Sequence, residues 1–263
     1  MRRLEGMSRA LPAALVALAL LAGWEAWVRI EAVPTYVLPA PSVIAQTLWQ
    51  DRAVLAAAWL VTMRITLMAL LAAAALGTLI AVGLAQSRLL ARAFYPYLVA
   101  LQVTPVVAIA PLIIIWVDSL WAALLICAWI VAFFPIVANT TLGLASADAG
   151  LKDLFRLYGA SRWQTLMHLQ APTALPYFLA GLRISTGLAL IGAVVAEFVA
   201  GTGGSASGLA YRILEAGYRL QIPRLFAALL LLSFTGIALH GLMTALSRRL
   251  LRHWHASAVA CDH

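Results

Sequence analysis

The chain has 263 residues, of which 64% are apolar and only 11% are charged, and its mean hydropathy is +0.95. A soluble domain carries about 25% charged residues, so this composition excludes a water-soluble globular protein. Backbone groups in lipid need internal partners, which leaves only helices or a closed barrel as spanning structures. The apolar stretches are long and continuous, whereas barrel strands alternate over about ten residues. The composition therefore predicts an all-α integral membrane protein.

The net charge of +8 raises the possibility of a nucleic-acid partner. The basic residues, however, lie in the gaps between apolar runs, where they orient membrane helices. We therefore expect no nucleic-acid binding. The two cysteines, Cys127 and Cys261, do not form a disulfide framework.

Six apolar runs are long enough to cross a bilayer, which needs about 20 residues. They lie at about residues 11–30, 57–85, 93–117, 119–147, 174–200 and 225–247, in a single membrane domain covering 1–263. The first run is too long for the apolar part of a signal peptide, so we predict a retained span. Only Asp118 separates the third run from the fourth, which predicts a helical hairpin with a very short loop. Three prolines lie inside spans and are expected to kink them: Pro105, Pro111 and Pro135.

The distribution of basic residues predicts that both termini are cytoplasmic. One side carries eleven Lys and Arg residues: Arg2, Arg3, Arg9, Arg88, Arg92, Lys152, Arg156, Arg162, Arg248, Arg249 and Arg252. The other carries five: Arg29, Arg52, Arg212, Arg219 and Arg224. The richer side is expected to face the cytoplasm.

The longest predicted cytoplasmic loop, at about residues 148–173, has a helical pattern of its own. Apolar residues at 151, 154, 155 and 158 follow the spacing of an amphipathic helix. Gly159 is placed to end that helix in a left-handed conformation. Ser161 and Gln164 form the sequence pattern of a capping box that opens a second helix, which we expect Pro172 to close. The pattern predicts a helix-turn-helix below the membrane.

Three interpretations of this loop are open. A DNA reader has this element order, but the loop is too short to form an independent domain between two spans. The second interpretation is a structured linker without a partner. The third interpretation is a docking element for a cytoplasmic motor.

Ionisable residues at membrane depth are costly and face a cavity or a partner. Arg64, Arg183 and Glu197 qualify. Snorkelling to an interface is an alternative for Arg64 and Glu197, and an interhelical or inter-subunit polar contact is the expectation for Arg183. Arg183 and Glu197 share the fifth span but lie about 21 Å apart along a helix, so they cannot pair within it. No pattern predicts a metal site or a catalytic group.

The loop resembles the signature of binding-protein-dependent ABC importer permeases. That signature is a Glu-Ala-Ala triplet, three residues, Gly, nine residues, Ile, one residue and Leu-Pro. Gly159 and Pro172 match it in identity and spacing, and Leu169 stands at the isoleucine. At the triplet this chain has Asp153, Leu154 and Phe155, which depart in all three positions, although Asp keeps the charge.

Further segments resemble the nitrate, sulfonate, taurine and pyrimidine-precursor branch of that family, over about residues 38 to 250. They are LPAPSVIAQTLWQ, TPVVAIAPLIIIWVDSLW, AFFPIVANT, TALPYFLAGLRIS, VVAEFVAG and GLAYRILEA. Where the branch has Trp-Phe-Gly, this chain has Trp116, Val117 and Asp118.

The resemblance implies the fold of a type I ABC importer permease and a role as a non-catalytic transport subunit. It implies three partners besides membrane lipid: a cytoplasmic ATPase dimer, a second permease copy or a paralogue, and a periplasmic or lipid-anchored binding protein. ATP and Mg would bind the ATPase, and this chain would hold no cofactor. The loop residues implied in ATPase coupling are Asp153, Leu154, Phe155, Arg156, Tyr158, Gly159, Ala160, Ser161 and Pro172. In permeases of this type the fifth span helps to line the central passage, which makes Arg183 and Glu197, together with Arg64, candidate pathway or gate residues.

The implied substrate is a small organic or inorganic anion, such as a sulfonate, taurine or nitrate, or a vitamin precursor of the pyrimidine or riboflavin type. An intramembrane enzyme is the first alternative, but the acids of this chain are scattered and no nucleophile is paired with a base. An autonomous channel or carrier is the second, and a bound ATPase would distinguish it from an importer.

Overall fold

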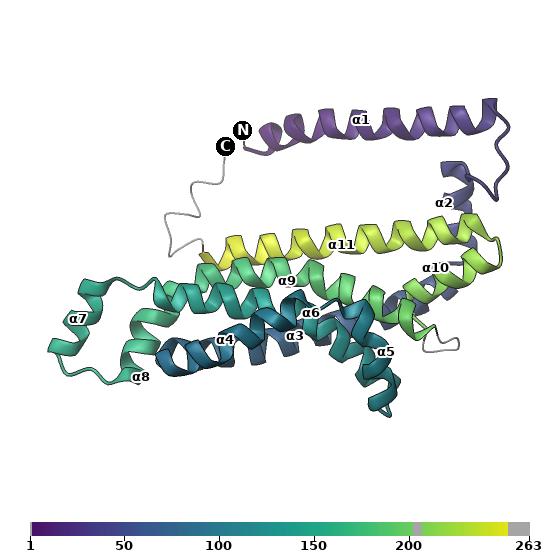
Figure 1. Cartoon of the computed structure of the whole chain (residues 1–263). Helices are drawn as coiled ribbons and strands as arrows, with labels where there is room; N and C mark the ends of the chain where they lie inside the picture. Colours follow the sequence, from purple (N-terminus) through teal and green to yellow (C-terminus); the bar gives the residue numbers. More distant parts are fainter. Residues whose placement is uncertain (1, 202–206, 252–263) are drawn as a thin grey trace.

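A computed structural model describes residues 2–201 and 207–251, and its regular elements are all helical (Figure 1). The α-helices are α1 (Arg2–Ile30), α2 (Pro41–Gln50), α3 (Arg52–Gln86), α4 (Arg88–Val103), α5 (Val106–Trp116), α6 (Leu120–Ala145), α7 (Ala149–Leu157), α8 (Arg162–Thr165), α9 (Ala171–Ala200), α10 (Leu209–Tyr218) and α11 (Ile222–Leu251). A π-helical turn, Leu166–Gln170, joins α8 to α9.

Four helices in the described residues are long and apolar enough to cross a membrane: α3, α6, α11 and the continuous helix Arg162–Ala200 that contains α9. They coincide with the second, fourth, fifth and sixth predicted spans. The first predicted span falls within α1, which is helical, and its place in a membrane stays a prediction. Most of the segment between α9 and α10, together with Arg252 and Cys261, lies outside the described residues.

The third predicted span is the exception, because it is not one continuous helix. It forms α4 and α5, whose axes are bent by 100° at a break around Thr104 and Pro105. Proline has no amide hydrogen to donate and pushes the residue before it out of the helical region. Thr104 accordingly has extended torsion angles, φ −71° and ψ 123°. A bent pair that crosses as one unit would be a fifth span.

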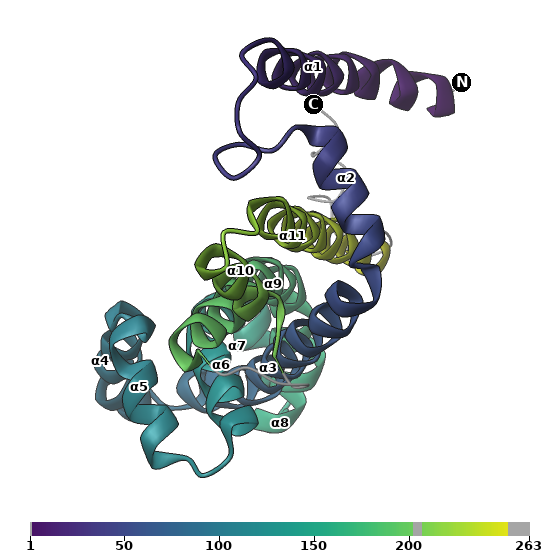
Figure 2. The same cartoon turned by 90° about the vertical axis from the view of Figure 1, so that its right-hand side faces the viewer.

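The long helices α3, α6, α9 and α11 run side by side along one direction, with α7 and α8 beyond one end and α10 at the other (Figure 1). In the end-on view, α4 and α5 lie on the opposite side of this bundle from α1 (Figure 2). The most extensive contact joins α6 and α9, and the next joins α3 and α6. These three helices form the centre of the molecule.

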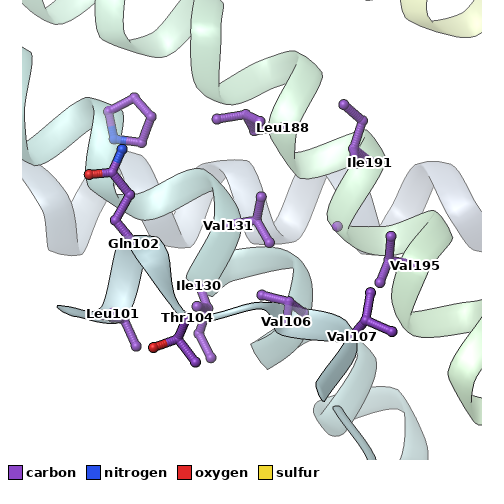
Figure 3. A pocket seen from close by; sticks show the side chains of 12 residues that line it. Leu101, Gln102, Thr104, Val106, Val107, Ile130, Val131, Leu188, Ile191 and Val195 are labelled. Carbon is purple, nitrogen blue, oxygen red and sulfur yellow. The ribbon is translucent and has the colours of Figure 1, made fainter. Parts of the chain in front are cut away.

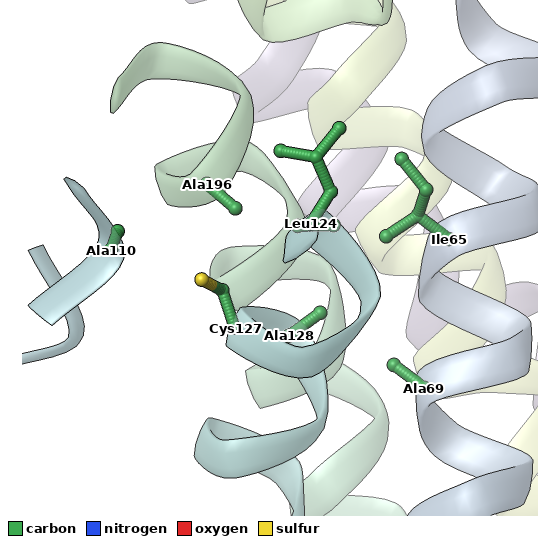
Figure 4. Close-up of a cluster of buried hydrophobic side chains, with 8 residues drawn as sticks. Ile65, Ala69, Ala110, Leu124, Cys127, Ala128 and Ala196 are labelled. Carbon is green, nitrogen blue, oxygen red and sulfur yellow. The ribbon is translucent and has the colours of Figure 1, made fainter. Parts of the chain in front are cut away.

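Small side chains allow the central helices to approach closely. One buried cluster contains residues of α3, α5, α6 and α9 (Figure 4): Ile65, Ala69, Ala110, Leu124, Cys127, Ala128, Ala193 and Ala196. Five of the eight are alanines: one each from α3, α5 and α6, and two from α9. Helices in lipid associate through van der Waals packing, and small residues bring their backbones close enough for it.

The short helix α2 was not predicted, although Pro41 at its start is a helix-opening signal. It is tied to the bundle by Asp51, which follows it and accepts two hydrogen bonds from Arg224 of α11, at 2.5 and 3.1 Å. Trp24 of α1 packs on Phe226 of α11, with ring centroids 6.0 Å apart. The end of α2 and the Trp24 end of α1 are thus both attached to the start of α11.

Candidate functional site

Three regions of the molecule carry features of a functional site: the α7–α8 loop, a cavity beside the α4–α5 break, and a buried network around Glu197. The first is a rigid protrusion at one end of the bundle. The second is bounded by the bent pair and by α6 and α9. The third lies at the end of α9 that faces α10.

Local hydrogen bonds hold both ends of α7. At its start, the Asp148 side chain accepts from the Leu151 amide at 2.9 Å. At its end, Gly159 has φ +69° and its amide donates to the Arg156 carbonyl at 3.0 Å. The Ala160 amide donates to the Phe155 carbonyl at 2.9 Å. These two bonds form the Schellman motif, whose left-handed residue favours glycine, so the predicted role of Gly159 is confirmed.

The second loop helix opens with the predicted capping box. The Gln164 amide donates to Ser161 Oγ at 3.2 Å, and the Ser161 amide donates to Gln164 Oε1 at 2.7 Å. Both ends of the turn are thus held by short-range hydrogen bonds. The loop is a rigid helix-turn-helix rather than a flexible connection.

The prediction that Pro172 closes the second loop helix is wrong. The helix continues through this residue, so that α8, the π-helical turn and α9 form one helical path from Arg162 to Ala200. The wider π-helical turn directly precedes the proline, and the Ala171 amide bonds to the carbonyl five residues earlier, at Leu166. An inserted turn of this kind displaces the carbonyl with which a proline ring would clash. The loop helix is therefore joined directly to a membrane span.

The apolar side chains of α7 are not covered within the described chain. None of its residues is buried. Leu151 and Leu154 are 46% and 44% exposed, and Leu157 and Tyr158 are both 84% exposed. Phe155 is half-buried. An exposed apolar strip on a rigid protrusion is a feature of interaction surfaces.

The remaining residues predicted for coupling also lie in or beside the α7–α8 turn. Asp153 and Arg156 form an exposed ion pair at 3.3 Å, Ala160 is half-buried, and Pro172 lies in α9 above the turn. The fold therefore brings the predicted loop residues together, apart from Pro172. Their contact with an ATPase stays a prediction.

A cavity of about 360 Å³ lies where the α4–α5 break faces α6 and α9 (Figure 3). It is lined by Leu101, Gln102, Thr104, Val106, Val107, Ile130, Val131, Pro135, Leu188, Ile191, Gly192 and Val195. Gln102 and Thr104 supply the only polar side chains of this lining, and none of its residues is charged. Such a mostly apolar cavity with a few polar groups is typical of small-molecule sites.

The sequence alone did not predict this cavity. Its only signal was Pro105, because a break in a span leaves room between helices. The remaining lining residues are aliphatic side chains, which look alike in the sequence whether they face lipid, a cavity or a neighbouring helix.

Glu197 lies in a buried network that connects three helices. Its side chain is 3% exposed. One carboxylate oxygen accepts from the Thr62 hydroxyl of α3 at 2.8 Å, and the other accepts from the Ala210 amide of α10 at 3.0 Å. The Thr62 oxygen in turn accepts from the Leu209 amide at 2.9 Å. The carboxylate and this hydroxyl therefore satisfy the first free amides of α10, as an N-cap does.

The other two predicted pathway residues lie apart from this network. Arg64 is exposed on α3. Arg183 is half-buried on α9, and its Nε is buried without a hydrogen-bond partner in the described residues. Neither they nor Glu197 line the cavity. Their role along a pathway stays a prediction.

No three His, Cys, Asp or Glu side chains lie close enough to hold a metal ion in residues 2–201 and 207–251. The described residues offer a rigid loop, an uncharged cavity and a helix, α10, that is held to the bundle by hydrogen bonds. A rigid loop joined to a helix beside a cavity suits a protein in which movement of a bound partner controls the passage of a solute.

Comparison with protein families identifies the chain. Residues 73–252 match the family described as the inner membrane component of binding-protein-dependent transport systems. The chain belongs to this family. The match includes α6, the rigid loop, the cavity and α9, and the all-α fold of a membrane permease agrees with it.

Named relatives of the permease share much of its length. RibX of Chloroflexus aurantiacus, a riboflavin transport system permease protein, is 35% identical over 259 residues, which cover 98% of this chain and 94% of that protein. ThiX of Halalkalibacterium halodurans, a formylaminopyrimidine transport permease protein, is 34% identical over 231 residues, covering 87% and 90%. SsuC of Bacillus subtilis, named for aliphatic sulfonates transport, is 35% identical over 164 residues, covering 62% and 57%.

A solved structure shares the fold of the permease. A chain of an amino acid ABC transporter, crystallised with histidines, aligns with a TM-score of 0.62 and 17% identity, covering 78% of this chain and 97% of that one. The likeness confirms the predicted ABC permease fold.

Proposed function

We propose that this permease forms the substrate passage of an ATP-driven importer in a bacterial inner membrane. Two copies, or this chain and a related one, enclose the passage. A cytoplasmic ATPase dimer binds the α7–α8 loops and holds the ATP and Mg, so this chain hydrolyses nothing itself. A periplasmic or lipid-anchored binding protein delivers the substrate. The termini and the α7–α8 loop then face the cytoplasm.

The observation that carries this proposal is the exposed apolar strip of α7, presented by a turn that is capped on both sides. Leu154, Leu157 and Tyr158 are uncovered in the described chain, and the Schellman motif and capping box fix their direction. A loop that transmits a movement of the ATPase to the membrane helices must be rigid, because a flexible loop would bend and leave the attached helix in place. The continuous helix from Arg162 to Ala200 supports direct transmission from the loop to the span beside the cavity.

Gly159→Pro tests the coupling role. Proline cannot adopt φ +69° and removes the amide that closes α7, so the strip should lose its fixed direction. We expect wild-type permease purified in mild detergent to bring down its ATPase in equal amount, and the proline variant to lose at least about nine-tenths of it, a tenfold change in binding.

Gly159→Asn is the matched variant, because asparagine tolerates the left-handed conformation and keeps the amide. It should retain the ATPase. If both variants bind the ATPase as wild type does, the loop is not the docking lever. Wild type that purifies alone and moves solute without ATP would establish the carrier alternative.

Within the two proposed substrate classes, the cavity favours a vitamin precursor. An anion that entered this cavity would lose its hydration and meet no cation in the lining. Burying an unpaired charge is costly. A planar, neutral heteroaromatic molecule would meet aliphatic walls, and the Gln102 amide and Thr104 hydroxyl could bond its ring nitrogens or carbonyl groups. The names of RibX and ThiX support the same class.

Leu188→Trp tests the cavity as part of the passage. An indole at this lining position would occupy the space, and we expect ATP-driven uptake of a flavin or pyrimidine into vesicles with the complete importer to fall at least about tenfold. ATPase binding should be unchanged. Leu229→Trp, on the exposed side of α11, is the matched control and should transport normally. Equal uptake by both variants, or uptake of a sulfonate in place of the heteroaromatic, would contradict this assignment.

A further inference from the structure

A second hollow, of about 600 Å³, lies between the α7–α8 loop and the adjacent ends of the long helices. It is lined by Ala85, Gln86, Lys152, Arg156, Ala160, Arg162, Thr165 and Gln170. Unlike the cavity beside the α4–α5 break, this lining is mostly polar. Three of its eight residues are cations, and none of those that the structure describes is acidic.

The three cations keep most of their hydrogen-bonding capacity. Lys152 Nζ donates one bond, to the Ala145 carbonyl at 3.1 Å. Arg156 has only the exposed pair with Asp153. Arg162 has no side-chain hydrogen bond or ion pair to the described part of the chain. Like charges collected around one hollow repel each other, and an anion bound between them removes that repulsion.

The hollow faces away from the apolar strip of α7. Lys152 and Arg156 are four residues apart and share a helix face. Leu154 lies about 160° around the helix from both, and Leu157 lies about 100° from Arg156 and about 140° from Lys152. The bond from Lys152 to Ala145, the last residue of α6, shows that this basic face points back toward the bundle. A protein bound to the apolar strip would therefore leave the hollow open.

Two glutamines line the side of the hollow that faces the helix bundle. Gln86 is the last residue of α3, and Gln170 directly precedes α9. Their side chains are joined by a hydrogen bond of 3.0 Å from Gln86 Nε2 to Gln170 Oε1. Gln86 ends the apolar span of α3, and the end of a span is expected near the lipid headgroups. Basic pockets between helices at this level suit anionic headgroups.

We infer that this hollow is a binding site for a phosphate-type anion, held by Lys152, Arg156 and Arg162. Two guanidinium groups and an ammonium match phosphate oxygens with charge-assisted hydrogen bonds. The phosphate can come from an anionic lipid headgroup or from inorganic phosphate in solution. Because its ligands belong to both loop helices, the bound anion would hold α7 against α8 and stiffen the loop. The ATPase contact is proposed on the apolar strip of α7, whereas Lys152 and Arg162 of the hollow are not among the predicted coupling residues; Arg156 and Ala160 belong to both sets.

Binding of a defined anion to the purified full-length permease tests the site. The detergent-solubilised protein is titrated with short-chain phosphatidylglycerol, with short-chain phosphatidylcholine, and separately with inorganic phosphate. We expect wild type to bind phosphatidylglycerol or inorganic phosphate, and phosphatidylcholine at least about tenfold more weakly. Binding of the lipid alone identifies a headgroup site, and binding of inorganic phosphate identifies a site for a soluble anion.

Variants locate the site. The double variant Lys152→Gln and Arg162→Gln should weaken binding at least about tenfold, whereas Arg162→Lys, which keeps the charge, should retain most of it. Arg92→Gln removes an exposed cation of α4 outside the hollow and should bind as wild type does. The inference is overturned if wild type binds neither anion, if the double variant and Arg92→Gln bind alike, or if added ATPase displaces the anion, since the cations would then belong to the ATPase interface.

Discussion

Gly181→Val is expected to separate α6 from α9 and to lower the free energy of unfolding by about 3 kcal/mol. A Cβ atom at this position would lie 2.8 Å from the Pro135 carbonyl oxygen and 3.3 Å from the Ile136 Cα. Both are backbone atoms, so the contact can be relieved only if one helix moves. Unfolding in mixed micelles with increasing denaturing detergent measures the loss.

Gly187→Val is the matched control for this variant. It lies in the same helix, its residue is exposed, and a Cβ there would meet nothing within 4 Å. The intrinsic helix preference of valine over glycine is the same at both sites, so the difference between the two variants isolates helix packing. If the two variants unfold at the same detergent concentration, the close approach of α6 to α9 does not depend on the absence of a side chain at Gly181.

Glu197→Ala is expected to lower the free energy of unfolding by about 3 kcal/mol and to release α10. The substitution leaves the Thr62 hydroxyl and the Ala210 amide without their acceptor at a site that is closed to water. Gly208 shows how tightly the carboxylate fits, because a Cβ there would overlap it. The thermal midpoint in detergent and the rate of protease cleavage before α10 measure the two effects.

Glu197→Gln separates the acceptor role from the loss of the side chain. Its carbonyl oxygen replaces one carboxylate oxygen, and its NH2 group, a donor, replaces the other. Either Thr62 or Ala210 therefore loses its acceptor, and we expect an intermediate loss. Glu31→Ala, at an exposed position, should leave the midpoint unchanged. A Glu197→Ala protein as stable as the Glu31 variant would show that the carboxylate does not hold α10.

The hydrogen bonds of Glu197 define how this residue can take part in movements of the permease. Its carboxylate connects α3, α9 and α10 at the end opposite the α7–α8 loop. Any movement of α9 that is driven from the loop must either carry α10 with it or break these hydrogen bonds. The predicted gate role of Glu197 would thus act through a helix tie and not through contact with substrate.

The α7–α8 loop could be predicted from the sequence because its hydrogen bonds join near neighbours. Gly159, Ser161 and Gln164 each bond within five residues, and the residue types that make such bonds are few. The membrane class and the approximate bounds of four spans follow from composition and run length. None of these properties depends on how the helices pack.

Tertiary structure alone decided the other features. The partners of Glu197 lie 135 and 13 residues away, and the close approach at Gly181 depends on where α6 crosses α9. The length of a run did not reveal that α4 and α5 turn by 100°, although Pro105 marked the place. In water, a helix shows its buried face by alternating apolar and polar residues. In lipid, the faces toward the bilayer, the cavity and the neighbouring helices are all apolar, so the sequence carries no such contrast and only packing distinguishes them.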